Sequence, residues 1–109
     1  MAIKAETEAD IQRACLAYLR LLGAWAVRVN TGAVRVGRRL VRFSDTVGCP
    51  DLLFTIGGRF CAAEIKKPGG RLRASQAAQL DAIRAAGGLG VVVRSVAELE
   101  AVLRAEGLA

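Results

Sequence analysis

The chain has 109 residues, of which 53% are hydrophobic, with 16 Lys and Arg against 10 Asp and Glu and no histidine. This length suits one domain with a single hydrophobic core, and the net charge of +6 favours an anionic partner, most often a nucleic acid. The missing histidine excludes His-based zinc fingers, His general bases and Ser-His-Asp triads, and three widely spaced cysteines support neither a zinc knuckle nor a disulfide framework. We therefore expect residues 1–109 to form one domain.

The first half of the chain predicts one helix followed by several strands. Residues 7–22 have apolar side chains at helical spacing, and Thr7 with Asp10 matches a capping box. Residues 24–30 alternate and predict a strand, and residues 33–43 predict a hairpin that turns near Gly37. Two further strands, over 51–56 and 59–66, are joined by Gly57-Gly58 and predict a second hairpin.

The second half predicts two helices around one more strand. Residues 68–75 form a basic, glycine-containing loop, and a helix follows over about 75–86 with Ser75 as its N-cap. A buried strand over 89–95 and a helix over 96–105 complete the pattern. The strand–helix–strand succession requires a parallel pair with a right-handed crossover. The order α-β-β-β-β-β-α-β-α therefore predicts a mixed α/β sheet covered by helices.

Three charged residues interrupt the second predicted hairpin. Asp51 follows Gly48-x-Pro50, and Glu64 lies deep in an apolar strand two residues before Lys66. An Asp after Pro is often only turn chemistry, and Glu64 with Lys66 can form an ion pair on an exposed face. A buried carboxylate, however, costs several kcal/mol unless it is paired or binds a metal. The spacing places Asp51 and Glu64 on adjacent antiparallel strands, where their carboxylates can converge.

Two converging carboxylates repel each other unless a cation lies between them. Carboxylates, waters and a substrate phosphate are the ligands that Mg²⁺ uses in proteins. A metal held there would polarise a phosphate, and Lys66 would orient water or neutralise developing charge. The residues alone thus indicate divalent-metal chemistry on a phosphate that needs no histidine.

The pattern "GCPD…EIK" resembles the signature of the PD-(D/E)XK nucleases, and the chain as a whole resembles the virus-type replication-repair nuclease (VRR-NUC) domain of that superfamily. Five features in order carry the resemblance, namely Glu8 with Ile11-Gln12, "VRVNTG", "GCPDLL", "EIKKPGGRLRASQ" and "GGLGVVVRS". The resemblance implies a restriction-endonuclease-like αβββαβ core, with a mixed sheet flanked by helices.

The resemblance also implies roles for individual residues. Asp51 and Glu64 would be metal ligands together with Glu8 and the backbone carbonyl of Ile65, and Lys66 would be the catalytic lysine. Gln76, at the start of the second helix, would support the site or contact phosphate. Glu8 and Gln76 also have plain interpretations, as a first-turn acid favoured by the helix dipole and as an exposed helix residue. Cys49 occupies the variable position of the motif and has no implied chemistry.

Two basic segments are candidates for phosphate binding. If both lie at the edge of the carboxylate site, they form a cationic rim. The aromatic residues are few and not interleaved with the arginines, which favours the DNA backbone over stacked bases. A solvated charged hairpin and a GC-rich genome explain the arginines equally well. The candidate residues are Arg35, Arg38, Arg39, Arg42, Lys67, Arg71 and Arg73.

The resemblance implies a Mg²⁺- or Mn²⁺-dependent endonuclease for branched DNA, similar to a Holliday junction resolvase, acting as a homodimer in the cytoplasm of a bacterium or a phage-infected cell. No apolar run approaches the ~18–20 residues that span a membrane, and the charged N-terminal segment is unlike a signal peptide. Alternatives are a non-specific or nicking nuclease, a non-catalytic DNA-binding module, and a small interaction domain with a structural Glu–Lys pair. The first hairpin offers an apolar dimer surface, namely Val34, Val36, Leu40 and Val41.

Overall fold

The computed structural model describes residues 5–29, 32–42 and 45–109. The helices are α1 (Glu8–Leu21), α2 (Ala74–Ala85) and α3 (Val96–Ala105). The strands are β1 (Trp25–Arg28), β2 (Ala33–Val36), β3 (Arg39–Arg42), β4 (Leu52–Ile56), β5 (Arg59–Ile65) and β6 (Leu89–Val93). The predicted element order is therefore confirmed. Residues 30 and 43, which the sequence assigns to strands, lie outside the described residues.

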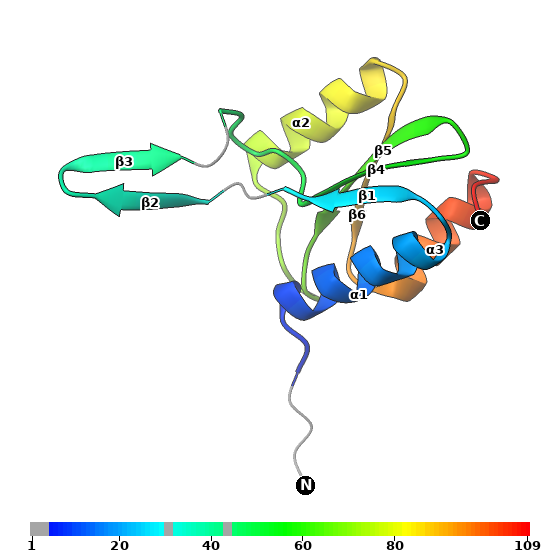
Figure 1. The fold of residues 1–109 in the computed structure, drawn as a ribbon. Helices are drawn as coiled ribbons and strands as arrows, with labels where there is room; N and C mark the ends of the chain where they lie inside the picture. Colours follow the sequence, from blue (N-terminus) through cyan, green and yellow to red (C-terminus); the bar gives the residue numbers. More distant parts are fainter. Residues whose placement is uncertain (1–4, 30–31, 43–44) are drawn as a thin grey trace, which may run out of the picture.

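Four strands form the main sheet, in the order β1-β4-β5-β6 (Figure 1). Strands β1, β4 and β5 are antiparallel neighbours, and β6 pairs with β5 in parallel. The turn between β4 and β5 uses Gly57 and Gly58, both at positive φ, as the hairpin prediction requires. With β2 and β3 set aside, the order α1-β1-β4-β5-α2-β6 is the αβββαβ core, and the predicted fold class is confirmed.

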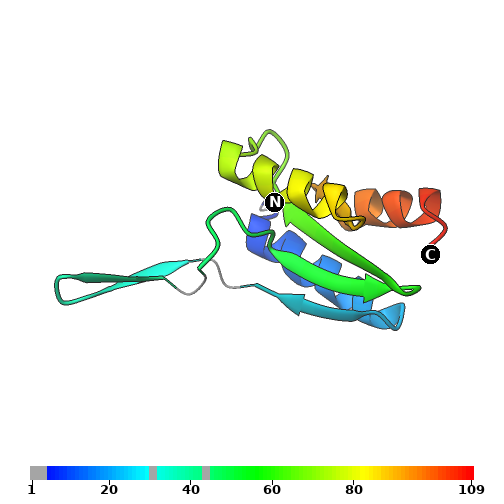
Figure 2. The same ribbon diagram turned by 90° about the horizontal axis from the view of Figure 1, so that it is seen from above.

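Helices cover both faces of the sheet. Helices α1 and α3 pack against each other on one face, whereas α2 packs on β5 and β6 from the other (Figures 1 and 2). Strand β5 is buried from Cys61 to Ile65, because this part is central in the sheet and covered on both sides. Its residues Cys61, Ala63 and Ile65 join the core under α1 and α3. Period two then turns Ala62 and Glu64 towards the face that carries α2.

The helix caps differ from the prediction at one place. Thr7 and Asp10 form the predicted capping box, with Asp10 N–H donating to Thr7 Oγ1 at 3.1 Å. Helix α2, however, begins at Ala74, and its N-cap is Arg73 rather than Ser75. The reason is Gln76, whose side-chain oxygen accepts from the Arg73 N–H at 2.9 Å. Within the described chain, no helix is long and apolar enough to cross a bilayer.

Strands β2 and β3 form a hairpin that stands apart from the main sheet (Figures 1 and 2). Among the described residues, the two strands contact no other helix or strand. Their register pairs Val34 with Val41, Val36 with Arg39 and Arg35 with Leu40. The valines therefore share one face with Arg39, while Leu40 lies on the other face. The four-residue apolar surface expected from the sequence is thus divided between two faces.

Candidate active site

The two carboxylates predicted to converge meet where β4 begins and β5 ends. The antiparallel register pairs Leu52 with Ala63, so one step further along places Asp51 opposite Glu64. The backbone N–H of Ile65 donates to Asp51 Oδ2 at 2.7 Å, and the N–H of Val29 donates to the Asp51 carbonyl at 2.8 Å. Asp51 is therefore held from β1 and β5 at once, before any ligand binds.

Glu64 is buried, with 2% of its surface exposed, and only one of its oxygens has a partner. The amide nitrogen of Gln76 donates to Glu64 Oε1 at 2.9 Å. Because the Gln76 oxygen accepts from Arg73 N–H, the start of α2 fixes the orientation of that amide. Glu64 Oε2 is buried and has no hydrogen-bond partner among the described residues. An unpaired buried oxygen of this kind calls for an explanation, and a cation or a proton on the carboxylate would supply one.

Lys66 lies on the same face, as the period of two predicts. Its ammonium nitrogen is 3.8 Å from Glu64 Oε1, and only 7% of the residue is exposed. The backbone N–H of Lys66 donates to Val93 O at 3.1 Å, which extends the parallel ladder beyond the end of β5. The ion pair considered from the sequence therefore exists, but it is buried beside Asp51 rather than solvated.

The site makes one of its acids hard to ionise. Burial, and then the neighbouring Asp51 carboxylate, raise the pKa of Glu64 from 4.5 to about 8, while Lys66 opposes the shift and Glu8 adds to it. A proton on Glu64 can be donated to Asp51, which removes the repulsion. Burial and the nearby acids also raise the pKa of the Cys49 thiol, so that thiol stays protonated at neutral pH. This agrees with assigning no chemistry to Cys49.

Glu8 lies near the pair without joining it. It lines a cavity of about 420 Å³ at the start of α1, together with Thr7 and Lys67. No group of three or more His, Cys, Asp or Glu in the described part of the chain is arranged to hold a metal. A metal at this site would therefore rest on Asp51, Glu64 and backbone or water oxygens first.

Arg94 is a residue at this edge that sequence reasoning missed. It lines a neighbouring cavity of about 360 Å³ with Lys67 and Pro68, and its guanidinium donates to Gly70 O at 3.1 Å. The loop after Lys66 is thereby tied to the end of β6. Only its place after a buried strand, where the edge of the sheet gathers side chains, could have indicated Arg94.

Gly48, the glycine of the G-x-P-D motif, lies where a side chain has no room. It has a φ of +81°, and a Cβ atom there would lie 2.4 Å from the carbonyl carbon and oxygen of Ser75. The turn before Asp51 therefore rests directly on the first turn of α2, the turn that carries Gln76. This contact aligns the two halves of the site.

Replacing Gly48 by alanine should destabilise the protein and disturb the site together. The substitution adds left-handed strain of about 1 kcal/mol and a backbone overlap that forces α2 away. Gly23→Ala is the matched control, because Gly23 has a φ of +84° with nothing within 4 Å of the added Cβ. Thermal unfolding should show a clearly larger fall in Tm for Gly48→Ala. Equal falls would mean that the contact with α2 contributes nothing.

The basic residues do not form one continuous rim. Arg71 and Arg73 are exposed in the loop before α2, and Lys67 is exposed directly after the site. Arg35, by contrast, belongs to the β2–β3 hairpin, whose strands contact only each other among the described elements. A cationic rim was expected only if both basic segments lie at the edge of the carboxylate site. Of the two, only the 67–73 segment lies there.

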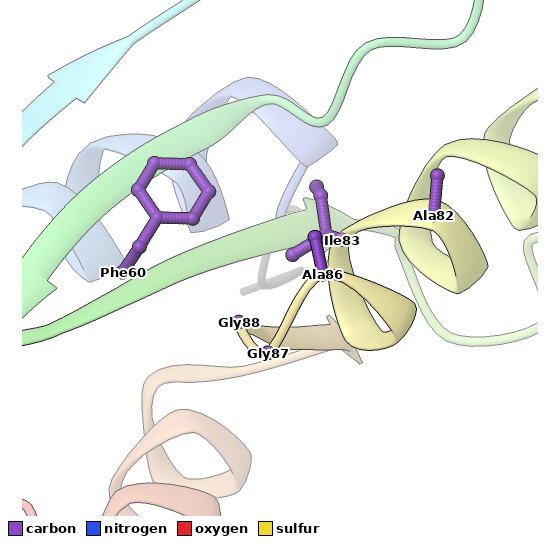
Figure 3. A pocket seen from close by; sticks show the side chains of 6 residues that line it. All are labelled: Phe60, Ala82, Ile83, Ala86, Gly87 and Gly88. Atoms are coloured by element: carbon purple, nitrogen blue, oxygen red, sulfur yellow. The ribbon is translucent and has the colours of Figure 1, made fainter.

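An apolar cavity of about 350 Å³ lies at the opposite end of the pair formed by β5 and α2 (Figure 3). Its lining has no ionisable side chain, and it is separated from Glu64 by the length of β5. It is therefore not part of the carboxylate site. The lining residues are Phe60, Ala82, Ile83, Ala86, Gly87 and Gly88.

Comparison with known proteins supports the fold through structure rather than sequence. No family model and no curated protein matches the chain by sequence. Two solved structures of VRR-NUC domains are similar, one with a TM-score of 0.65 and 19% identity over 89% of this chain and 94% of that one. The other has a TM-score of 0.61 and 18% identity over 93% of this chain and 88% of that one.

A third solved structure is Hjc of Archaeoglobus fulgidus, a Holliday junction resolvase from an archaeal hyperthermophile. It has a TM-score of 0.53 and 24% identity, over 80% of this chain and 67% of that one. At these identities the similarity concerns the fold. The chain therefore has the fold of VRR-NUC domains and of the archaeal resolvase, the restriction-endonuclease-like PD-(D/E)XK core, and the resemblance seen in its sequence is confirmed at that level.

Proposed function

We propose that residues 1–109 act as a single nuclease domain that hydrolyses phosphodiester bonds in DNA with the help of Mg²⁺ or Mn²⁺. The observation that carries the proposal is the group formed by half-buried Asp51 with buried Glu64 and Lys66, in which Glu64 Oε2 has no partner among the described residues. A buried acid beside a second carboxylate and one lysine costs stability, and such groups cluster at functional sites. The similarity in fold to a Holliday junction resolvase supports the same reading.

The residues present fit a divalent cation. The donors are carboxylate oxygens, which Mg²⁺ and Mn²⁺ prefer, and one of them, the buried Glu64 Oε2, has no hydrogen-bond partner among the described residues. Asp51, Glu64 and the carbonyl of Ile65 would hold the ion together with Glu8, whose charge acts on Glu64. When bound, such an ion polarises a phosphate and lowers the pKa of water.

The chain's own residues then supply position and charge. Lys66 is fixed by burial beside Glu64, so its ammonium can stabilise the negative charge that develops on a phosphate without first reorganising. Gln76 donates to Glu64 Oε1, so Oε2 is the oxygen of that carboxylate left without a partner among the described residues. Asp51 is held by the N–H of Ile65. Lys67, Arg71 and Arg73 would bind the phosphates on either side.

We further propose branched DNA as the substrate and a homodimer as the active form. One chain offers one carboxylate site, and cutting two strands symmetrically needs two sites related by a two-fold axis. The resolvase with a similar fold is named for a four-way junction. Such an activity belongs to replication and repair in the cytoplasm, including that of a phage or prophage.

The test is cleavage of labelled linear duplex, single-stranded, flap and immobile four-way junction DNA, each with Mg²⁺, Mn²⁺ or EDTA. Asp51→Asn should abolish cutting, because it removes half of the carboxylate pair. Asp81→Asn is the matched control, since Asp81 is an exposed acid on α2, paired with Arg84. Its cleavage rate should equal that of the wild type.

Each outcome selects one reading. Metal-dependent cutting of the junction alone supports the resolvase, and cutting of every substrate supports a non-specific or nicking nuclease. Salt-sensitive binding without cutting under any metal would replace the enzyme by a DNA-binding module. Cutting that survives Asp51→Asn would contradict the assigned site.

A further inference from the structure

The β2–β3 hairpin has no role in the active site described above, yet it carries a concentrated charge. Residues 32–42 contain four arginines and no acidic residue. In the described chain its strands contact only each other, and it projects outward in both views (Figures 1 and 2). The hairpin carries no acidic residue to balance its arginines, and this charge suits an anionic partner from outside the chain.

The hairpin is anchored beside Asp51. The N–H of Val29, directly after β1, donates to the carbonyl of Asp51, directly before β4, at 2.8 Å. This bond joins the two ends of the segment that carries the hairpin. One of those ends is Asp51, which the nuclease proposal places in the site. A strand rises about 3.3 Å per residue, so the four-residue strands reach about 13 Å from their base. That length corresponds to about four base pairs of duplex DNA.

We propose that the β2–β3 hairpin is an arm that grips the duplex flanking the phosphate to be cut. The proposal rests on the nuclease function above and adds where the DNA runs. A two-stranded ribbon fits the width of the major groove, and arginines at its tip and edges are suited to bidentate contacts with phosphate. The tip carries Arg38 and Arg39, and Arg35 lies on the face opposite the valines.

A second copy of the chain fits the hairpin less well than DNA does. Two such ribbons would bring eight arginines together without an acidic residue to balance them. The shared apolar face consists of Val34, Val36 and Val41, which are 44%, 59% and 40% exposed. Three partly exposed valines supply far less than the roughly 800 Å² that each partner buries in a stable interface.

The proposal is tested by removing the arm's charge in the Asp51→Asn background, which keeps the DNA intact. The test variant is Arg35→Gln/Arg38→Gln/Arg39→Gln. The control is Arg13→Gln/Arg59→Gln/Arg104→Gln, which removes the same number of charges from exposed positions that pair with acids elsewhere. Fluorescence anisotropy with a labelled duplex of about 24 bp, titrated from about 50 to 300 mM NaCl, gives the affinity and its salt dependence.

We expect the arm variant to bind at least ~10-fold more weakly at about 100 mM NaCl and to lower the slope of log K against log salt by about 2 to 3. The control should change the affinity by less than about 3-fold. On duplexes trimmed to end at the proposed cleavage position, where the arm has no DNA to hold, the wild type and the arm variant should bind alike. The rate of cleavage by the wild-type chain, which keeps Asp51, should also fall when the flank is shortened by about four base pairs.

Several results would overturn the proposal. Equal weakening by both variants would show that positive charge contributes to binding but that the hairpin has no special part in it. Unchanged binding by the arm variant, or no duplex binding by the wild type, would contradict the proposed arm. If Val34→Thr/Val36→Thr/Val41→Thr dissociates a dimer in sedimentation while the arginine variant binds normally, the hairpin holds a second copy instead. The nuclease proposal fails separately, because a wild-type chain that never cuts can still show the arm's salt slope.

Discussion

Replacing Glu64 by glutamine should make the protein more stable at pH 8 while abolishing cleavage. The wild type buries an acid whose pKa is raised from 4.5 to about 8, first by burial and then by Asp51. The folded state therefore binds one proton more than the unfolded state between these two values, and the free energy of unfolding falls as pH rises through this window. Each pKa unit corresponds to about 1.4 kcal/mol, so the fall amounts to a few kcal/mol. For a chain of this size we expect Tm to drop by roughly 10 to 20 °C.

Thermal unfolding in EDTA from pH 5 to pH 8 measures this directly. Glu64→Gln keeps the shape of the side chain and loses the charge, so its curve should lack the fall. Glu100→Gln, which removes a half-buried acid paired with Arg104 away from the site, should keep the fall. Adding Mg²⁺ or Mn²⁺ at pH 8 should restore stability to the wild type and much less to Glu64→Gln, because the ion takes the place of the proton. A wild-type curve that does not fall between pH 5 and pH 8 would contradict the raised pKa.

Replacing Lys66 by methionine should lower kcat about 10²- to 10³-fold while changing the affinity for DNA by less than about 3-fold. Lys66 is 7% exposed and 3.8 Å from Glu64 Oε1, so its charge is fixed in the site and contributes little to the surface that DNA first meets. Methionine keeps the length of the aliphatic stem. The loss therefore reports the charge that stabilises the developing negative charge on the phosphate.

Lys67→Met supplies the contrast within the same loop. Lys67 is exposed and lines the cavity that also holds Glu8, so its loss should raise KM and weaken the salt dependence with little effect on kcat. Single-turnover cleavage and anisotropy separate the two effects. A normal kcat for Lys66→Met would contradict the role assigned to Lys66. A larger loss in kcat for Lys67→Met than for Lys66→Met would mean that the two roles are exchanged.

Much of the fold followed from local signals that tertiary contacts do not override. Thr7 and Asp10 cap α1 as their spacing requires, Gly57-Gly58 turn the β4–β5 hairpin, and the strand–helix–strand order around α2 imposes the parallel pair of β5 and β6. The start of α2 was missed by one residue, because the sequence offers Ser75 as a cap whereas Gln76 bonds to the Arg73 N–H instead. Cap residues compete, and only their three-dimensional partners decide between them.

The sequence by itself determined which residues form the candidate site. A carboxylate in each of two paired strands, with a lysine two residues after the second, must meet on one face because side chains alternate with a period of two. Gln76 was singled out by the resemblance to VRR-NUC domains, which did not indicate the residue that its side chain contacts.

Only the tertiary structure decided how these residues are held and which basic segments accompany them. The partner of Gln76 is Glu64, the contact of Gly48 is Ser75, and the anchor of Asp51 is Val29, all of which are pairings between segments that local spacing does not encode. The burial that raises the pKa of Glu64 likewise depends on packing between segments far apart in the sequence, at the end of β5 beside the start of α2. The hairpin arginines had the same sequence signal as those near the site, but no contact brings them to it, because a ribbon covered by neither layer projects from the sheet.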